Sequence, residues 1–76
     1  MMNNDPRLIS PEIATIAANL PALVAIRDAC RDIGFYPEEC VTAGLLDLLA
    51  VLVESETPPD SPEHDAARVA LVGAAA

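Results

Sequence analysis

Residues 41–53, VTAGLLDLLAVLV, decide how the rest of this chain can fold. Eight of the thirteen are valine or leucine, and Asp47 carries the one charge. Side chains this apolar are driven out of water. A chain of 76 residues buries only roughly 60% of the surface that its unfolded form exposes. The stretch therefore predicts contact with a second molecule as well as with the chain's own core.

On a helical wheel, the apolar side chains of this stretch form one wide stripe, with Asp47 on the opposite side. We expect half of the stripe to pack against the other helices, and this half contains Val41, Leu45, Leu48 and Leu52. Gly44 costs a helix interior about 1 kcal/mol relative to alanine, which favours a close approach of another helix. The predicted oligomer interface is the remaining half with this glycine: Gly44, Leu46, Leu49 and Val53.

Helix boundaries are marked by capping residues and prolines along the rest of the chain. Ser10 and Ser61 are each followed by Pro-Glu, which is typical of a helix start. Pro21 lacks the N–H that a helix interior requires, so we expect a break or kink at residues 19–21. Gly34 can take the left-handed conformation that ends a helix. These signals predict helices over residues 11–18, 21–33, 37–55 and 62–72.

Composition favours an all-α fold. Phe35 and Tyr36 are the only aromatic residues, so the core must consist of Leu, Ile, Val and Ala, and no segment alternates as a strand does. We predict a small bundle of three to four short helices, in which 21–33 and 37–55 form an αα-hairpin. The expected organisation is a flexible arm over 1–8, a single helical domain over 9–73 and a frayed tail over 74–76.

The charge of the chain restricts its partners. Twelve acidic residues and four arginines give a net charge of −8, and the chain has no lysine. Nucleic acids and anionic membrane surfaces bind clustered basic residues, so we expect this protein to bind neither directly. The sequence predicts a basic partner, with solubility as the alternative explanation. The candidate patch for that partner contains Glu54, Glu56, Asp60, Glu63 and Asp65.

The candidates for catalysis or metal binding are Cys30, Cys40 and His64. Structural zinc sites use pairs such as Cys-x-x-Cys, which the sequence lacks. Ser10 and Ser61 are explained as helix caps, and helices of this total length seldom enclose a pocket. We therefore expect no enzyme activity, no cofactor and no metal. A minimal enzyme or metal-binding protein that uses these three residues remains the minor alternative.

Residues 41–53 are too few to span a bilayer, which takes about 20 apolar residues. The N-terminus, MMNNDPRL, lacks the basic and apolar segments of a signal peptide. We therefore expect a cytoplasmic protein with both thiols reduced.

Together these features favour a non-enzymatic regulatory or adaptor protein that acts by protein–protein interaction. We expect it to form a homodimer and to act on a second protein, of which a basic nucleic-acid-binding protein is one type. If the partner is a basic nucleic-acid-binding protein, the chain would act as an anti-activator, an antitoxin or a DNA mimic. The main alternative is a structural or assembly subunit of a larger complex.

Overall fold

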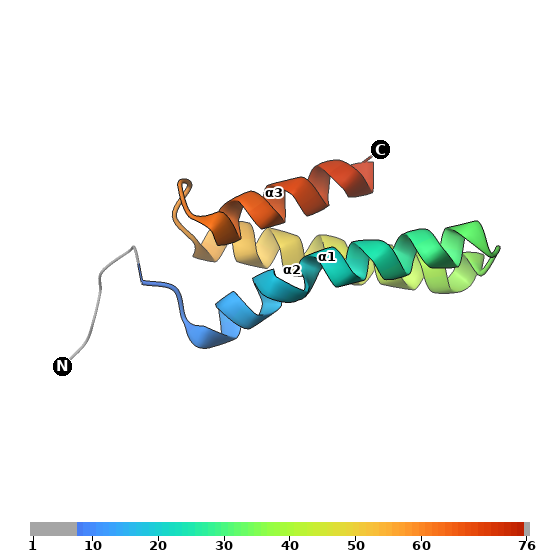
Figure 1. The fold of residues 1–76 in the computed structure, drawn as a ribbon, viewed down its shortest axis with the longest axis horizontal. Helices are drawn as coiled ribbons and strands as arrows, with labels where there is room; N and C mark the ends of the chain where they lie inside the picture. The colour runs from blue at the N-terminus through green and yellow to red at the C-terminus, as the bar shows by residue number, and fades with distance from the viewer. Residues whose placement is uncertain (1–7, 76) are drawn as a thin grey trace.

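The structure is a computed structural model, and it describes residues 8–75. It contains the helices α1 (Pro11–Asp32), α2 (Tyr36–Glu56) and α3 (Pro62–Ala75) (Figure 1). Each helix contacts the other two, and residues 8–75 contain no strand. The predicted all-α class is confirmed. The predicted arm (1–8) and tail (74–76) fall largely outside the described side chains and stay predictions.

The start of α1 follows its predicted capping chemistry. The Ser10 hydroxyl accepts a hydrogen bond from the Ile13 N–H at 3.1 Å, which satisfies one of the amides that a helix N-terminus leaves free. Pro11 occupies the first turn, and Glu12 places a negative charge near the positive end of the helix dipole.

The prediction of separate helices over 11–18 and 21–33 is wrong, because α1 is continuous through Pro21. Pro21 has no N–H, so the helix offers the Ala17 carbonyl no i+4 donor. Ala17 and Leu20 are both buried beside this point, and their packing holds the chain helical in spite of the missing bond. The proline bends α1 without ending it, and α1 changes direction near its middle (Figure 1).

The turn between α1 and α2 is a complete Schellman ending, as predicted. Gly34 has a φ of +83°, which a residue without a Cβ adopts at no steric cost. The Phe35 N–H donates to the Cys30 carbonyl at 2.8 Å, and the Gly34 N–H donates to the Arg31 carbonyl at 3.2 Å. Arg31 also pairs with Glu39 on α2 at 3.0 Å. These contacts fix the geometry of the hairpin.

Ser61 starts α3 in the predicted way. Its hydroxyl accepts from the His64 N–H at 3.1 Å and donates to the Pro58 carbonyl at 2.8 Å. α2 ends at Glu56 and α3 begins at Pro62, so each boundary lies within a residue of its prediction, whereas α3 continues three residues beyond the predicted end.

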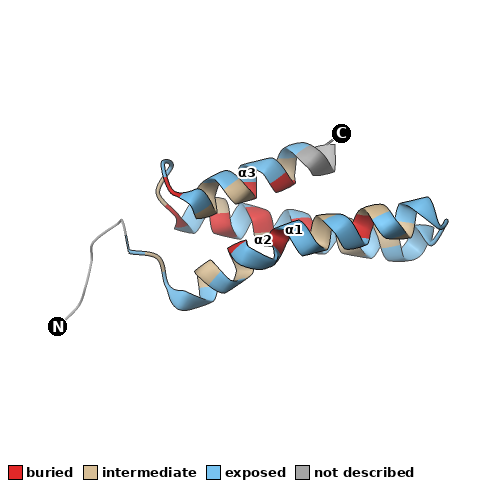
Figure 2. Cartoon of the chain, viewed as in Figure 1, coloured by how far each residue is buried: buried red, intermediate tan, exposed pale blue. Residues whose placement is uncertain are grey.

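The buried residues form a narrow core between the helices (Figure 2), and this core is rich in alanine. All three helices contribute to it, and four of its seven members are alanines. Small side chains let helices approach closely, but they remove little apolar surface from water. The larger aliphatic residues are therefore only partly covered by this core. Its members are Ala17, Leu20, Leu46, Ala50, Val53, Ala67 and Ala70.

Candidate interaction surface

The structure reverses the two predicted halves of the α2 stripe. Leu46 and Val53, predicted to face outward, are fully buried at 0% exposure, and Leu49 is partly buried against the core. The half predicted to face the other helices points to solvent instead. Val41 and Leu48 are each 73% exposed. The predicted interface residues other than Gly44 therefore belong to the core or its edge.

Close packing explains this reversal. Leu46, Ala50, Val53 and Thr57 recur at helical spacing, and all are buried. Ala50 had been assigned to the polar side of the wheel because alanine carries little hydrophobic weight. Where α2 meets two other helices, a face containing a small residue allows a shorter distance between helix axes. The signal was present in the sequence as an alanine within an i, i+4, i+7 pattern.

Four exposed apolar residues of α2 form a continuous surface, which we call the outer α2 stripe: Val41, Leu45, Leu48 and Leu52. Their spacing of four, three and four residues is that of a coiled-coil seam, in which side chains of two helices interdigitate. All four are classed as exposed, and α1 and α3 lie against the opposite side of α2. The stripe is therefore an uncovered helix face.

Gly44 lies beside the outer α2 stripe. It is exposed, and a Cβ built at this position would meet no atom within 4 Å. No contact within residues 8–75 therefore explains a glycine in the middle of a helix. Close approach by another molecule would explain it, as the sequence predicts, although the leucines beside it differ from those expected.

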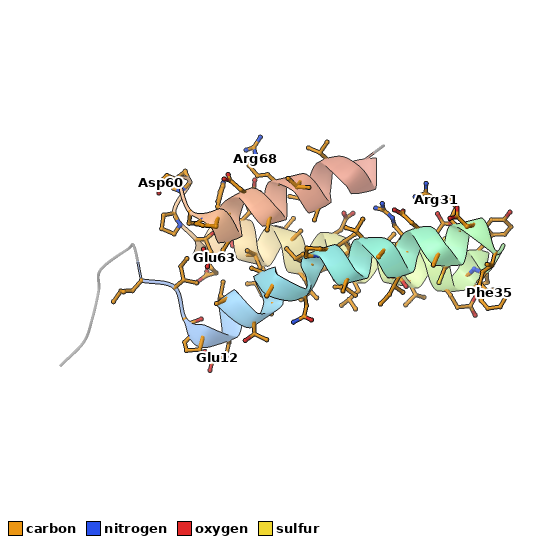
Figure 3. All side chains as sticks on the ribbon, in the orientation of Figure 1. Glu12, Arg31, Phe35, Asp60, Glu63 and Arg68 are labelled. Atoms are coloured by element: carbon orange, nitrogen blue, oxygen red, sulfur yellow. The ribbon has the colours of Figure 1, made fainter. Side chains whose placement is uncertain are left out.

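The predicted acidic patch lies around the α2–α3 connection. Its five members come from the last turns of α2, the linker and the first turn of α3, and Asp60 and Glu63 appear at this end in Figure 3. The Glu54 carboxylate lies 3.7 Å from the Arg68 guanidinium. Asp60 and Asp65 are exposed, whereas Glu54 and Glu63 are partly covered. The linker brings these residues together because it reverses the chain.

Arg27 is a buried charge that the sequence does not reveal, because a charged residue of a surface helix ordinarily lies on its solvent side. The residue is 4% exposed. Its Nε and NH2 atoms donate to the Asp28 carboxylate at 3.1 and 2.9 Å, and its buried NH1 atom has no hydrogen-bond partner. Arg31 donates to the same Asp28 oxygen at 3.2 Å. A chain of charges thus runs from Arg27 to Glu39 on α2.

The hairpin tip carries the chain's two aromatic residues on its surface. Phe35 is 54% and Tyr36 63% exposed, and Ile33 beside them is also exposed. Figure 3 shows Phe35 at the end of the molecule away from the acidic patch. Aromatic side chains are enriched among the residues that dominate binding energy at interfaces. The tip is thus a second apolar surface, separate in position from the acidic patch.

The residues considered for catalysis or metal binding do not converge. Cys30 is half-buried, Cys40 is exposed, and both are free thiols. Within residues 8–75, no three of the His, Cys, Asp and Glu side chains are grouped as metal ligands would be. His64 instead contacts backbone and hydroxyl groups of the α2 terminus.

α1 is the one helix of the described chain that is long and apolar enough to cross a bilayer by length and composition. This helix lies near the N-terminus. The most apolar 18-residue window within it has a mean hydropathy of 1.4, and 17% of that window is buried. Core helices of soluble proteins pass the same test. The exposed side of α1 carries the half-exposed Ile26 together with four alanines: Ala18, Ala22, Ala25 and Ala29.

Comparison with models of known protein families, with curated proteins and with solved structures finds no match for this chain.

Proposed function

We propose that this chain is a non-enzymatic regulatory or adaptor protein that works as a homodimer joined through the outer α2 stripe. One observation carries the proposal: a helix face with coiled-coil spacing is left uncovered in a chain too small to cover it. A two-fold axis would set this stripe against its own copy, so that each protomer covers the other's leucines.

The strength of such a dimer follows from its apolar area. Full burial of a leucine or valine side chain contributes about 1.5–3 kcal/mol. The stripe residues are about half exposed on average, so the two copies together would gain on the order of 10 kcal/mol. Association costs about 4–15 kcal/mol in lost freedom. The net gain is then at most about 6 kcal/mol, so the expected dimer is reversible, with a dissociation constant no tighter than tens of micromolar.

The charge supports a basic protein as the second partner. Each chain carries −8, and the acidic patch is presented at the end of the molecule opposite the hairpin tip (Figure 3). A surface of one sign attracts a partner of the other sign and speeds the encounter. Proteins that bind nucleic acid have such basic surfaces, which makes a regulator of that class the partner type we propose.

Sedimentation equilibrium across the micromolar range tests the homodimer. Leu48→Asp places a charge in the centre of the stripe and should leave a folded monomer. Ala25→Asp is the matched control, because it adds the same charge to an exposed helical position outside the stripe. Dimers in the wild type and control, with monomers in Leu48→Asp, would support the proposal. A monomeric wild type would refute the dimer.

Co-purification from the native host tests the second partner. Partners that are basic, and that are lost when Asp60 and Asp65 are both changed to asparagine, support the proposed docking. An exclusively acidic set of partners would overturn the charge argument.

The exposed hairpin tip favours one other function, that of a subunit built into a larger assembly. Ile33, Phe35 and Tyr36 would then be covered permanently by a neighbouring subunit. Such a chain should aggregate when expressed alone and become soluble with its neighbour. A chain that stays soluble alone as a defined dimer argues for the regulator.

A further inference from the structure

Two hollows lie side by side between α1 and α3. One, of about 200 Å³, is lined by Ala14, Ala17, Ala18, Pro62, Glu63 and Ala66. The second, of about 290 Å³, is lined by Pro21, Val24, Ala66, Val69 and Ala70. Ala66 belongs to both, so the two hollows form one groove, which we call the α1–α3 groove. It is separate from the outer α2 stripe, which shares none of its residues.

We infer that the α1–α3 groove binds a basic amphipathic helix of the partner protein. This inference rests on the proposed basic partner, and it names the surface and the segment that meet. It does not depend on the homodimer, because the two surfaces have no residue in common.

The dimensions of the groove suit a helix. Its α1 side runs from Ala14 to Val24, and ten residues of helix rise about 15 Å, or nearly three turns. Alanines form half of its lining, so a helix laid along it could approach both neighbours closely. Val69 on α3 is 72% exposed and offers a larger apolar contact at the edge. A helix in this position would be the fourth of a bundle.

The polar groups of the groove call for donors and positive charge. Glu63 is its one charged lining residue. Arg31 pairs with Glu39 and Arg68 with Glu54, both on α2, and Arg27 is buried against Asp28. No arginine of residues 8–75 thus lines the groove. A lysine or arginine of the occupant supplies the countercharge that Glu63 lacks within the groove.

The test uses a synthetic peptide of leucine and lysine with helical i, i+3, i+4 patterning as the probe. A peptide of leucine and glutamate with the same pattern is its control. Fluorescence anisotropy gives the affinity, and amide chemical shifts locate the bound site. We expect the lysine peptide to bind at least about tenfold more tightly than the glutamate peptide, with shifts confined to the lining of the groove.

A matched pair of variants separates groove binding from general attraction between opposite charges. Ala18→Arg fills the groove and adds a positive charge to it, whereas Ala22→Arg adds the same charge at an exposed position that lines neither hollow. We expect Ala18→Arg to weaken peptide binding about tenfold and Ala22→Arg to change it far less. Circular dichroism should show that both variants keep their helices.

Three results would overturn the inference: no binding of the lysine peptide, equal weakening by the two arginine variants, or shifts centred on the outer α2 stripe. Repeating the titration with Leu48→Asp distinguishes the two proposals. Binding to this monomeric variant supports the groove whatever the fate of the dimer, and loss of binding there contradicts it.

Discussion

The Nδ1 atom of His64 lies 3.1 Å from the backbone oxygen of Glu54, across the turn that joins α2 to α3. A carbonyl can only accept, so the imidazole donates from Nδ1. Thr57 completes the ending, because its hydroxyl donates to the Val53 carbonyl at 2.6 Å. Two of the carbonyls that every helix C-terminus leaves free are thus satisfied by side chains. The first turn of α3 caps the last turn of α2.

His64→Ala should lower the free energy of unfolding by about 1 kcal/mol, the usual net value of one hydrogen bond. Urea denaturation followed by circular dichroism measures this change. Arg68→Ala is the control from the same helix, since its exposed guanidinium lies 3.7 Å from Glu54 and should contribute less. A larger loss for Arg68→Ala would show that the ion pair, and not the histidine cap, joins the two helices.

Arg27→Met should leave stability unchanged or raise it. Among residues 8–75 the buried NH1 atom has no hydrogen-bond partner, and burying a guanidinium costs desolvation energy. The Asp28 side chain is 47% exposed and keeps its ion pair with Arg31, so the substitution leaves no buried charge unpaired. Thermal unfolding of Arg27→Met and of Arg31→Met, an exposed member of the same network, provides the comparison. A clear loss of stability in Arg27→Met alone would mean that the buried guanidinium is satisfied by water.

Leu46→Ala and Leu48→Ala should separate the two faces of α2. Leu46 is fully buried, so truncation should cost about 2–5 kcal/mol. Leu48 is exposed, and truncation should change the stability of the monomer by no more than about 0.5 kcal/mol. Denaturation at low protein concentration measures the free energy of unfolding of the monomer. Sedimentation at high concentration measures the dissociation constant of the dimer. If both variants lost the same free energy of unfolding at low protein concentration, the assignment of Leu46 to the core and Leu48 to the surface would be contradicted.

Pro21→Ala should raise the free energy of unfolding by about 2–2.5 kcal/mol. Alanine restores the hydrogen bond to the Ala17 carbonyl, and an interior proline costs a helix about 3 kcal/mol. Part of that gain is lost because proline also restricts the unfolded chain, by about 0.4–1 kcal/mol. Pro37→Ala, in the first turn of α2, should bring no gain. A destabilised Pro21→Ala would show that the bend itself is needed for packing.

Added salt should tighten the homodimer and weaken docking to the basic partner. Two chains of −8 repel each other, and the Debye length falls from about 10 Å at 0.1 M to about 3 Å at 1 M salt. Screening lowers this repulsion, while it also lowers the attraction of the basic partner. Sedimentation equilibrium at increasing sodium chloride measures the first effect. A dimer that dissociates in salt would be held by ion pairs and not by the outer α2 stripe.

Local chemistry made the helix ends predictable from the sequence. The caps at Ser10 and Ser61 and the left-handed Gly34 depend on residues within a few positions of each other. The sequence alone therefore determines them, and the hairpin between α1 and α2 follows. The acidic patch was predictable for the same reason, because its members lie close together along the chain.

Tertiary packing decided the features that the sequence reading missed. Pro21 is tolerated because Ala17 and Leu20 are held by other helices, and no local signal reports that support. The wheel of α2 is apolar over two adjacent faces, so it could not show which face the core selects. The burial of Arg27 likewise depends on where α2 lies. Of the four residues predicted to form the oligomer interface, Gly44 is the one that the structure leaves exposed.

The hairpin tip gains a further property from two-fold symmetry. In the proposed homodimer, each protomer presents its own Phe35 and Tyr36 on a turn held by the Gly34 ending and the Arg31–Glu39 pair. A target with two matching sites would then be bound twice by one dimer, the second time at a high effective concentration. Weak single contacts would add up to long residence on an array of repeated sites, and dilution to the monomer would release the target.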